Sequence, residues 1–133
     1  MLESFDRVFG DKSLLIVKNL IAQALSNLLE NAIKYSNTGT TIWVVAVSKQ
    51  EEDGLWRGIS VINIGLPISP GEVSHLADRG FRGNAAKQKI PAGTGIGLYL
   101  ASKVMRLHQG GVIPKVKALE TRMTLIFPPS RVV

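Results

Sequence analysis

The sequence predicts a two-layer α/β sandwich, in which helices pack on one face of a mainly antiparallel sheet. Two stretches with apolar residues at helical spacing, about 14–35 and 95–108, predict the helical layer. Two pairs of short stretches rich in β-branched residues predict the sheet. Neither a sequence repeat nor a linker interrupts the 133 residues, so residues 1–133 are expected to form a single domain.

Composition narrows the functional classes. Hydrophobic residues make up 45% of the chain, which excludes a disordered tail, and the absence of cysteine excludes disulfides and thiolate metal sites. The absence of cysteine also fits a reducing cytoplasm, and the sequence has no apolar run long enough to span a membrane and no signal-peptide pattern. The formal charge of +6 is compatible with nucleic-acid binding, but a local anionic ligand explains the basic group between Arg79 and Lys89 equally well.

The first long helix is predicted from about residue 14 to residue 35. Asp11 or Ser13 is expected to cap its start, and the polar segment 36–39 ends it. Residues 1–11 are ambiguous. The apolar residues of this helix form one stripe, at positions 14, 17, 21, 24, 25, 28 and 32.

The sheet is predicted as two hairpins. Residues 41–49 and 55–63 are expected to form the first, joined by an Asp-Gly turn signal, and residues 112–118 and 121–127 the second. Pro114 suggests an edge position or an irregularity, because proline cannot donate a ladder hydrogen bond.

The segment between the hairpins is less regular. Residues 70–77 suggest a short helix, and residues 78–93 a long mobile loop of the kind that often serves as a lid. The second long helix is predicted from about residue 95 to residue 108, where Gly110 and Gly111 stop it.

Three glycines, Gly93, Gly95 and Gly97, stand at alternate positions where this helix begins. Glycines let backbone N–H groups approach an anion, and a helix start adds unpaired N–H groups and the positive end of the helix dipole. A phosphate site is one interpretation, and a flexible loop before a helix is the other.

Polar residues form a line on the first helix. Asn27, Asn31 and Lys34 fall within about 60° of one another around the axis, beside the apolar stripe. An amide oxygen suits Mg²⁺ that already carries phosphate oxygens, and a lysine can reach a phosphate. The alternative is a solvated helix surface with a cap.

One further polar residue, Asn63, ends an apolar strand and would be at least half-buried, so its amide needs partners. A nucleobase edge is one candidate and a local turn interaction is the other.

Together these stretches resemble the ATP-binding catalytic domain of sensor histidine kinases, within the superfamily that includes gyrase, mismatch-repair and heat-shock chaperone ATPases. Residues 25–35 resemble its N box, 63–68 its first glycine box and 93–98 its second glycine box. Residues 80–84 lie where its lid carries an arginine, and 107–111 resemble its Leu-His-Gly-Gly helix end. The order and spacing of the motifs are more specific than any one of them.

The resemblance implies an ATP and Mg²⁺ site below a long ATP lid. Asn31 would coordinate Mg²⁺, Asn63 would meet the adenine amino group, and Gly65 would let the chain pass close to the base. Arg82 would approach the γ-phosphate, acting with Asn31 and Lys34 as a catalytic residue. The other implied nucleotide-binding residues are Asn27, Tyr35, Ile68, Gly93, Thr94, Gly95, Ile96, Gly97 and Leu98.

Two departures from the family pattern matter. The family most often has aspartate where this chain has Asn63, and an amide that can present a donor should reject guanine less strongly. Pro67 stands where a second glycine is common, which stiffens the loop and should leave ATP binding intact.

Other residues bear on the reaction. The related hydrolysing ATPases have a water-activating glutamate where this chain has Asn27, which cannot act as a base, and Glu30 points about 100° away from Asn31. This favours transfer to an external nucleophile. Neither His75 nor His108 fits the family's phosphoacceptor pattern, and His108 is expected to be structural.

The sequence is therefore interpreted as a fragment of a two-component sensor kinase that lacks the dimerisation and phosphoacceptor domain. It should bind ATP without phosphorylating itself, with that histidine-bearing domain and a response regulator as partners. Its expected location is the cytoplasm, either free or as part of a membrane-anchored sensor. A turnover-deficient nucleotide-binding or interaction module is the alternative; no nucleic acid is expected as partner.

Overall fold

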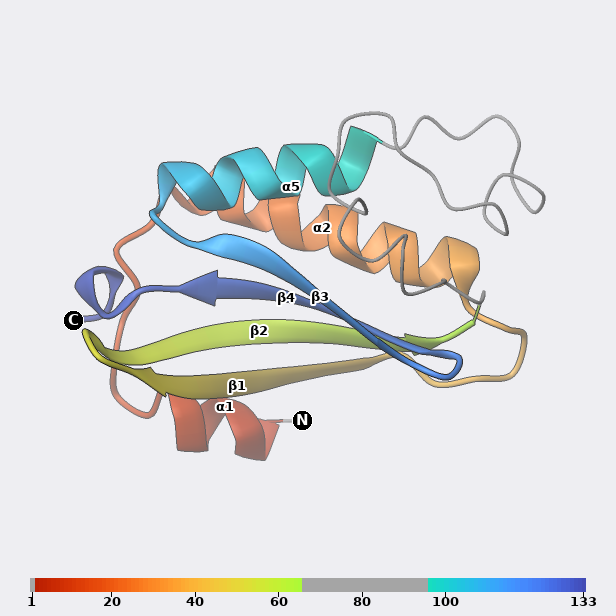
Figure 1. The fold of residues 1–133 in the computed structure, drawn as a ribbon, viewed down its shortest axis with the longest axis horizontal. Helices are drawn as coiled ribbons and strands as arrows, with labels where there is room; N and C mark the ends of the chain where they lie inside the picture. Colours follow the sequence, from red (N-terminus) through yellow and green to blue (C-terminus); the bar gives the residue numbers. More distant parts are fainter. Residues whose placement is uncertain (1, 66–95) are drawn as a thin grey trace.

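The computed structural model describes residues 2–65 and 96–133 and confirms the two-layer sandwich (Figure 1). Helices α2 (Lys18–Tyr35) and α5 (Ile96–Leu107) lie side by side over one face of a four-stranded antiparallel sheet with the order β1-β2-β4-β3. None of the helices in these two segments is long and apolar enough to cross a membrane. The other elements are α1 (Leu2–Val8), β1 (Trp43–Glu51), β2 (Gly54–Ile64), β3 (Gly111–Lys117), β4 (Glu120–Phe127) and the 3-10 turn η1 (Pro129–Arg131).

Both hairpins form as the sequence predicts. β1 pairs with β2 from Trp43 opposite Ile62 to Glu51 opposite Gly54, so the first strand lies two residues later than expected. β3 pairs only with β4 in the described sheet, which places Pro114 on an edge strand, as expected. The short helix expected at 70–77 and the loop at 78–93 lie outside the described residues.

The start of α2 differs from the prediction. The helix begins at Lys18, because the preceding segment is extended and pairs with the C-terminal end of the chain: Leu14 forms a bridge with Val132. The cap residue is Val17, which makes no side-chain capping bond, so the caps predicted at Asp11 and Ser13 are wrong. Tertiary pairing thus overrides an apolar spacing that continues the helical pattern.

The core lies between the helices and one face of the sheet. The inward stripe of α2 and α5 packs on alternate residues of β2 and β4, as the sandwich architecture requires. Of the stripe predicted on the first helix, Val17 is largely exposed, because it precedes α2. The buried hydrophobic cluster comprises Ile21, Ala24, Leu28, Ala32, Val61, Ala101, Val104, Met105, Met123, Leu125 and Phe127.

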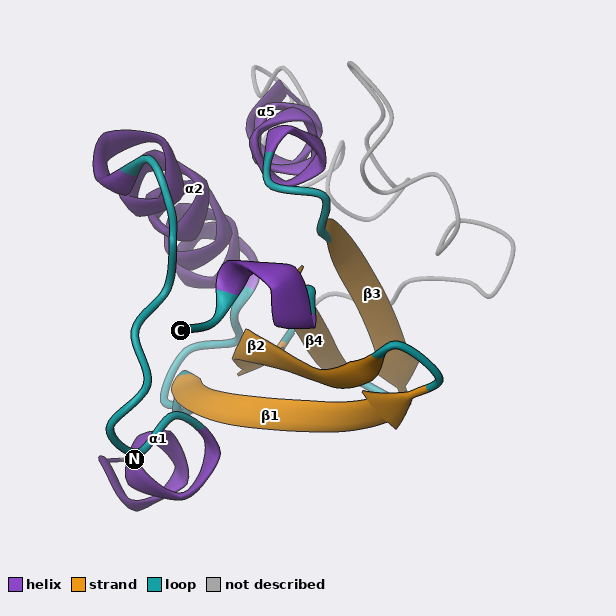
Figure 2. Ribbon diagram, turned by 90° about the vertical axis from the view of Figure 1, so that its left-hand side faces the viewer, coloured by secondary structure: helices purple, strands orange, loops and turns teal. Residues whose placement is uncertain are grey.

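Helix α1, which the sequence left ambiguous, lies beside β1 at the end of the molecule where the chain begins (Figure 2). The Ala46 N–H of β1 donates to Ser4 Oγ at 3.1 Å, and Arg57 Nε donates to the Val8 carbonyl at 2.9 Å. The first contact gives a backbone N–H of the edge strand β1 a partner, and the second ties the end of α1 to β2, so that α1 covers part of the sheet edge.

His108 joins the end of α5 to the start of α2. Its ring is 2% exposed, and its Nε2 accepts a hydrogen bond from the Val17 N–H at 3.0 Å. The proton therefore resides on Nδ1, which donates to the Val104 carbonyl at 2.8 Å. Both ring nitrogens are engaged within the fold, in keeping with the structural role expected from the sequence.

Replacing His108 with alanine is expected to lower the free energy of unfolding by about 2–4 kcal/mol, through a cavity and an unpaired Val17 N–H at the start of α2. Urea denaturation would measure the loss. The exposed neighbour Arg106 on the same helix provides the control, because Arg106→Ala should change stability by less than about 0.5 kcal/mol. Equal losses in the two variants would contradict the role given to His108.

Candidate functional site

The polar line of α2 meets the start of α5. Asn27 Nδ2 donates to the carbonyl oxygen of Gly97, the second residue of α5, at 3.2 Å. These residues are 70 positions apart in the chain, and the sequence placed both in one site. Asn27 and Asn31 are half-buried, whereas Lys34 is exposed in the last turn of α2. The amide-lined helix face therefore lies against the glycine-containing helix start.

The end of β2 is held against the end of α2. Ser36 and Gly65 form a bridge, and the Asn37 N–H donates to the Ile64 carbonyl at 2.8 Å. A Cβ added to Gly65 would lie only 1.9 Å from the carbonyl oxygen of Tyr35, which no side chain tolerates. The backbone contact alone thus requires glycine at this position. The role expected for Gly65 beside a nucleobase stays a prediction.

Asn63 is a buried amide at this same end of β2. It is 5% exposed, and it stands opposite Thr121 of β4, which is also 5% exposed. Both lie on the sheet face that carries Val61 and Met123 and turns toward the helices. Within residues 2–65 and 96–133, the structure records no hydrogen bond from either side chain.

Buried polar groups without partners are rare and destabilising, by about 1–3 kcal/mol each. A ligand that presents donors and acceptors to this part of β2 would satisfy the amide of Asn63. Sequence reasoning missed Thr121, although its place at the start of the final strand, on the face of Met123, is a signal that strand alternation could have supplied.

The remaining predicted site residues divide into two groups. Tyr35 is half-buried at the end of α2, and Ile96 opens α5. Leu98 packs against the hydrophobic core, which gives this residue a structural role whatever it does toward a ligand. The others lie outside the described residues: Ile68, Arg82, Gly93, Thr94 and Gly95.

The chemistry available in the described part of this site is that of amides, one lysine and a helix start. Neither α2 nor α5 carries an acidic residue in its first turn, so no carboxylate in that turn neutralises the positive end of the helix dipole. No group of three His, Cys, Asp or Glu residues that could hold a metal ion occurs in the described segments. The candidate metal ligand on α2 is the amide of Asn31, a neutral oxygen donor.

Comparison with known proteins places the chain in a family. Residues 16–131 match the family described as "Histidine kinase-, DNA gyrase B-, and HSP90-like ATPase". The chain is 37% identical over 123 residues to the sensor histidine kinase CusS of Escherichia coli K12, covering 92% of this chain and 25% of CusS. It is 35% identical over 124 residues to the sensor protein CzcS of Cupriavidus metallidurans, with 92% and 25% coverage. The chain thus spans about a quarter of the length of these relatives.

Solved structures share the fold. The mycobacterial sensor histidine kinase MprB superposes with a TM-score of 0.73 at 23% identity, covering 96% of this chain and 90% of that chain. Full-length ShkA, solved in complex with AMPPNP, superposes with a TM-score of 0.65 at 18% identity, covering 86% of this chain and 22% of ShkA. At these identities the likeness establishes the fold.

Proposed function

Because this chain belongs to the histidine kinase-, DNA gyrase B- and HSP90-like ATPase family, we propose that it is the ATP-binding catalytic domain of a two-component sensor histidine kinase. In this proposal the domain transfers the γ-phosphate of ATP to a histidine on a separate dimerisation domain of the parent kinase, and a response regulator receives it next. The parent would place this domain in the cytoplasm, either free or below a membrane anchor.

The observation that carries the proposal is the hydrogen bond between Asn27 and Gly97. It brings the amide-lined face of α2 next to the start of α5, the two parts that in this proposal would lie on either side of one triphosphate. The amide of Asn63, which is buried and has no hydrogen-bond partner among residues 2–65 and 96–133, supports a base-binding pocket at the neighbouring end of β2. The fit of these residues to a nucleotide rests on two features, the polar face of α2 beside the start of α5 and the buried amide of Asn63.

Each residue then has a chemical role. Asn31 would hold Mg²⁺ through its amide oxygen, and Lys34 would place its ammonium group beside the phosphates. Bound Mg²⁺ would supply neutralisation of phosphate charge, which together with positioning is most of what phosphoryl transfer requires. Asn27, whose amide is committed to Gly97, cannot activate water, and this favours an external acceptor over hydrolysis.

The acceptor is proposed to lie on another domain. His108 is buried with both ring nitrogens in hydrogen bonds, so it is unsuited to attack a phosphate. His75 lies outside the described residues, and its sequence context does not match a phosphoacceptor.

Incubation with γ-labelled ATP and Mg²⁺ tests the proposal. Label should appear as acid-labile phosphohistidine on the histidine-bearing dimerisation domain when it is added in trans, and not on this chain alone. Label on the isolated chain would contradict the proposal. ATP binding without any transfer would instead support the alternative, a turnover-deficient nucleotide-binding module.

The neutral amide at position 63 should broaden nucleotide selection. An Asn63→Asp variant is expected to raise the preference for ATP over GTP about tenfold, or 1.4 kcal/mol, because a carboxylate accepts from the adenine amino group and repels the guanine carbonyl. Competition between the two nucleotides for a fluorescent ATP analogue would measure the ratio. Equal discrimination by the two proteins would show that Asn63 does not contact the base.

A further inference from the structure

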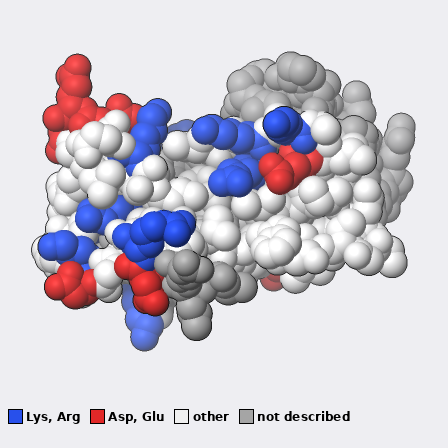
Figure 3. Space-filling model, turned by 90° about the horizontal axis from the view of Figure 1, so that it is seen from below, with Lys and Arg blue, Asp and Glu red and all other residues white. Residues whose placement is uncertain are grey.

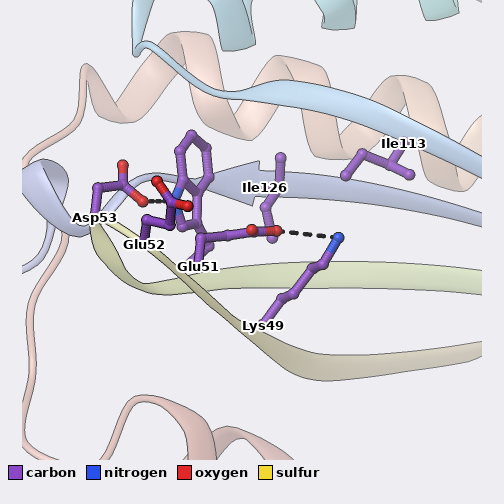
Figure 4. Close-up of a pocket in the computed structure, with 7 residues that line it drawn as sticks. Lys49, Glu51, Glu52, Asp53, Ile113 and Ile126 are labelled. Atoms are coloured by element: carbon purple, nitrogen blue, oxygen red, sulfur yellow. Dashed lines mark hydrogen bonds and ion pairs between the residues drawn. The ribbon is translucent and has the colours of Figure 1, made fainter.

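The face of the sheet that turns away from the helices carries a hollow beside the turn between β1 and β2 (Figure 4). Its volume is about 580 Å³. Figure 4 shows acidic side chains on one side of it and isoleucines from β3 and β4 on the other. The lining residues are Lys49, Glu51, Glu52, Asp53, Trp56, Ile113 and Ile126.

One glycine, Gly111, leaves the sheet surface open beside Ile126, whereas the side chains of Ile126 and Thr124 already fill the space that a Cβ of Gly58 would take. Gly58 of β2 and Gly111 of β3 stand on either side of Ile126 in the strand register, so this row has no side chain next to the isoleucine. A Cβ added to Gly111 would meet no atom within 4 Å, which shows that the space above it is open. The floor is therefore apolar, and Ile113 at its far edge is 40% exposed.

The rim carries negative charge in a chain whose formal charge is +6. Glu51 pairs with Lys49 at 3.0 Å, and Asp53 Oδ1 accepts the indole N–H of Trp56 at 2.8 Å. Glu52 has no ion pair with another residue in the described ranges. In the space-filling view of Figure 3, red acidic side chains gather at the upper left corner, and other red groups lie at the lower left and near the centre.

The indole ring gives the acidic rim a specific chemistry. The hydrogen bond from Trp56 to Asp53 orients the ring at the edge of the hollow, with carboxylates close to it. An arginine side chain satisfies both features, because its guanidinium group stacks on an aromatic ring and pairs with carboxylates in the same geometry. Arginine and apolar anchors in pockets are also the groups that dominate binding energy at protein interfaces.

We propose that this hollow docks a segment of a partner protein in which an arginine stands next to an apolar residue. The arginine stacks on the ring of Trp56 and pairs with the carboxylates of Glu52 and Asp53, and the apolar side chain enters the space over Ile126. The other end of the same sheet face carries Lys115, Lys117 and Arg122 against one acid, Glu120, and this net positive charge repels a basic segment and confines it to the acidic end. Asn63 points to the opposite face, so docking is independent of nucleotide.

Titration of the ¹⁵N-labelled chain with the peptide acetyl-Gly-Arg-Leu-Gly-amide tests the proposal by NMR. The indole N–H signal of Trp56 should shift with peptide concentration. That of Trp43, which is 55% exposed on the same face at the basic end, should not. A matched peptide with neutral citrulline in place of arginine should bind about tenfold more weakly.

Variants of the hollow distinguish the contribution of its carboxylates to peptide binding from that of its open space. Glu52→Gln and Asp53→Asn should each weaken peptide binding severalfold, whereas Asp11→Asn, the same charge change at an exposed site outside the hollow, should leave binding unchanged. Gly111→Leu should weaken binding by filling the space without altering charge.

Three results would overturn the proposal: a Trp56 signal that stays fixed, equal binding of the arginine and citrulline peptides, or shifts that follow protein concentration without peptide. The last would identify a second copy of the chain as the occupant. Because no nucleotide is added, failure here leaves the kinase proposal standing, and failure of ATP binding leaves this one standing.

Discussion

Replacing Asn31 with alanine is expected to lower the Mg²⁺-dependent affinity for ATP by about tenfold to a hundredfold, or 1.4–2.8 kcal/mol. The physical reason is that the amide oxygen of Asn31 is the only Mg²⁺ ligand that we propose on α2, and alanine offers no donor atom in its place. Calorimetric titration with ATP, with and without Mg²⁺, would measure the change. Without Mg²⁺ the variant and the parent chain should bind ATP with similar affinity.

Asn19 provides a matched control for this experiment. It is an exposed amide on the same helix, three turns before Asn31 and away from Gly97, so Asn19→Ala removes the same chemical group from outside the site. Its ATP affinity should be unchanged. Both variants should retain nearly full stability, because neither side chain is fully buried. An Asn31→Ala protein with normal Mg²⁺-dependent binding would remove the metal role assigned to this residue.

Replacing Gly65 with alanine should be among the most disruptive single changes for stability in the described part of the chain. The new methyl group would lie 1.9 Å from the carbonyl oxygen of Tyr35, so the end of β2 and the end of α2 must separate. We expect a loss of about 3–5 kcal/mol in the free energy of unfolding, at the upper end of single substitutions. Urea denaturation would measure it, and ATP affinity should fall as the two elements move apart.

Two other glycines provide comparisons for the expected stability loss of Gly65→Ala. A Cβ at Gly110 would lie 2.0 Å from the carbonyl oxygen of Ile126, so Gly110→Ala should be similarly destabilising. A Cβ at Gly111 meets nothing within 4 Å, so Gly111→Ala should be nearly neutral. If Gly65→Ala behaved like Gly111→Ala, the close approach of Gly65 to Tyr35 would not exist in solution.

The fold was predictable because its elements carry strong local patterns. Both hairpins and both long helices have apolar spacings that their own packing demands, and the structure places them within a few residues of the predicted bounds. The start of α2 was not predictable in the same way. Leu14 and Val17 continue the helical spacing, but the chain there pairs with Val132, more than a hundred residues later. A pattern of neighbouring residues cannot predict a contact between two segments so far apart in the sequence.

The candidate site was predictable only in part. The polar line on α2 is visible as a pattern, whereas its contact with Gly97 depends on how two distant helices pack. The family resemblance supplied that connection. Asn63 lies opposite Thr121 because of the register between β2 and β4, and sequence analysis did not predict that register. The requirement for glycine at position 65 arises from the backbone of Tyr35, so inspection of the motif alone could not reveal its cause.

The hydrogen bond from Val17 to His108 has a consequence for the control of ligand affinity. It anchors α2 to α5 at the end opposite Gly97, about 21 Å along α2 from Asn31. Because the helices are joined there, a small change in the angle between them would act on the hydrogen bond from Asn27 to Gly97 at the far end, where the triphosphate would lie. Second-site substitutions around His108 could therefore tune nucleotide affinity remotely, with every side chain that meets ATP left intact.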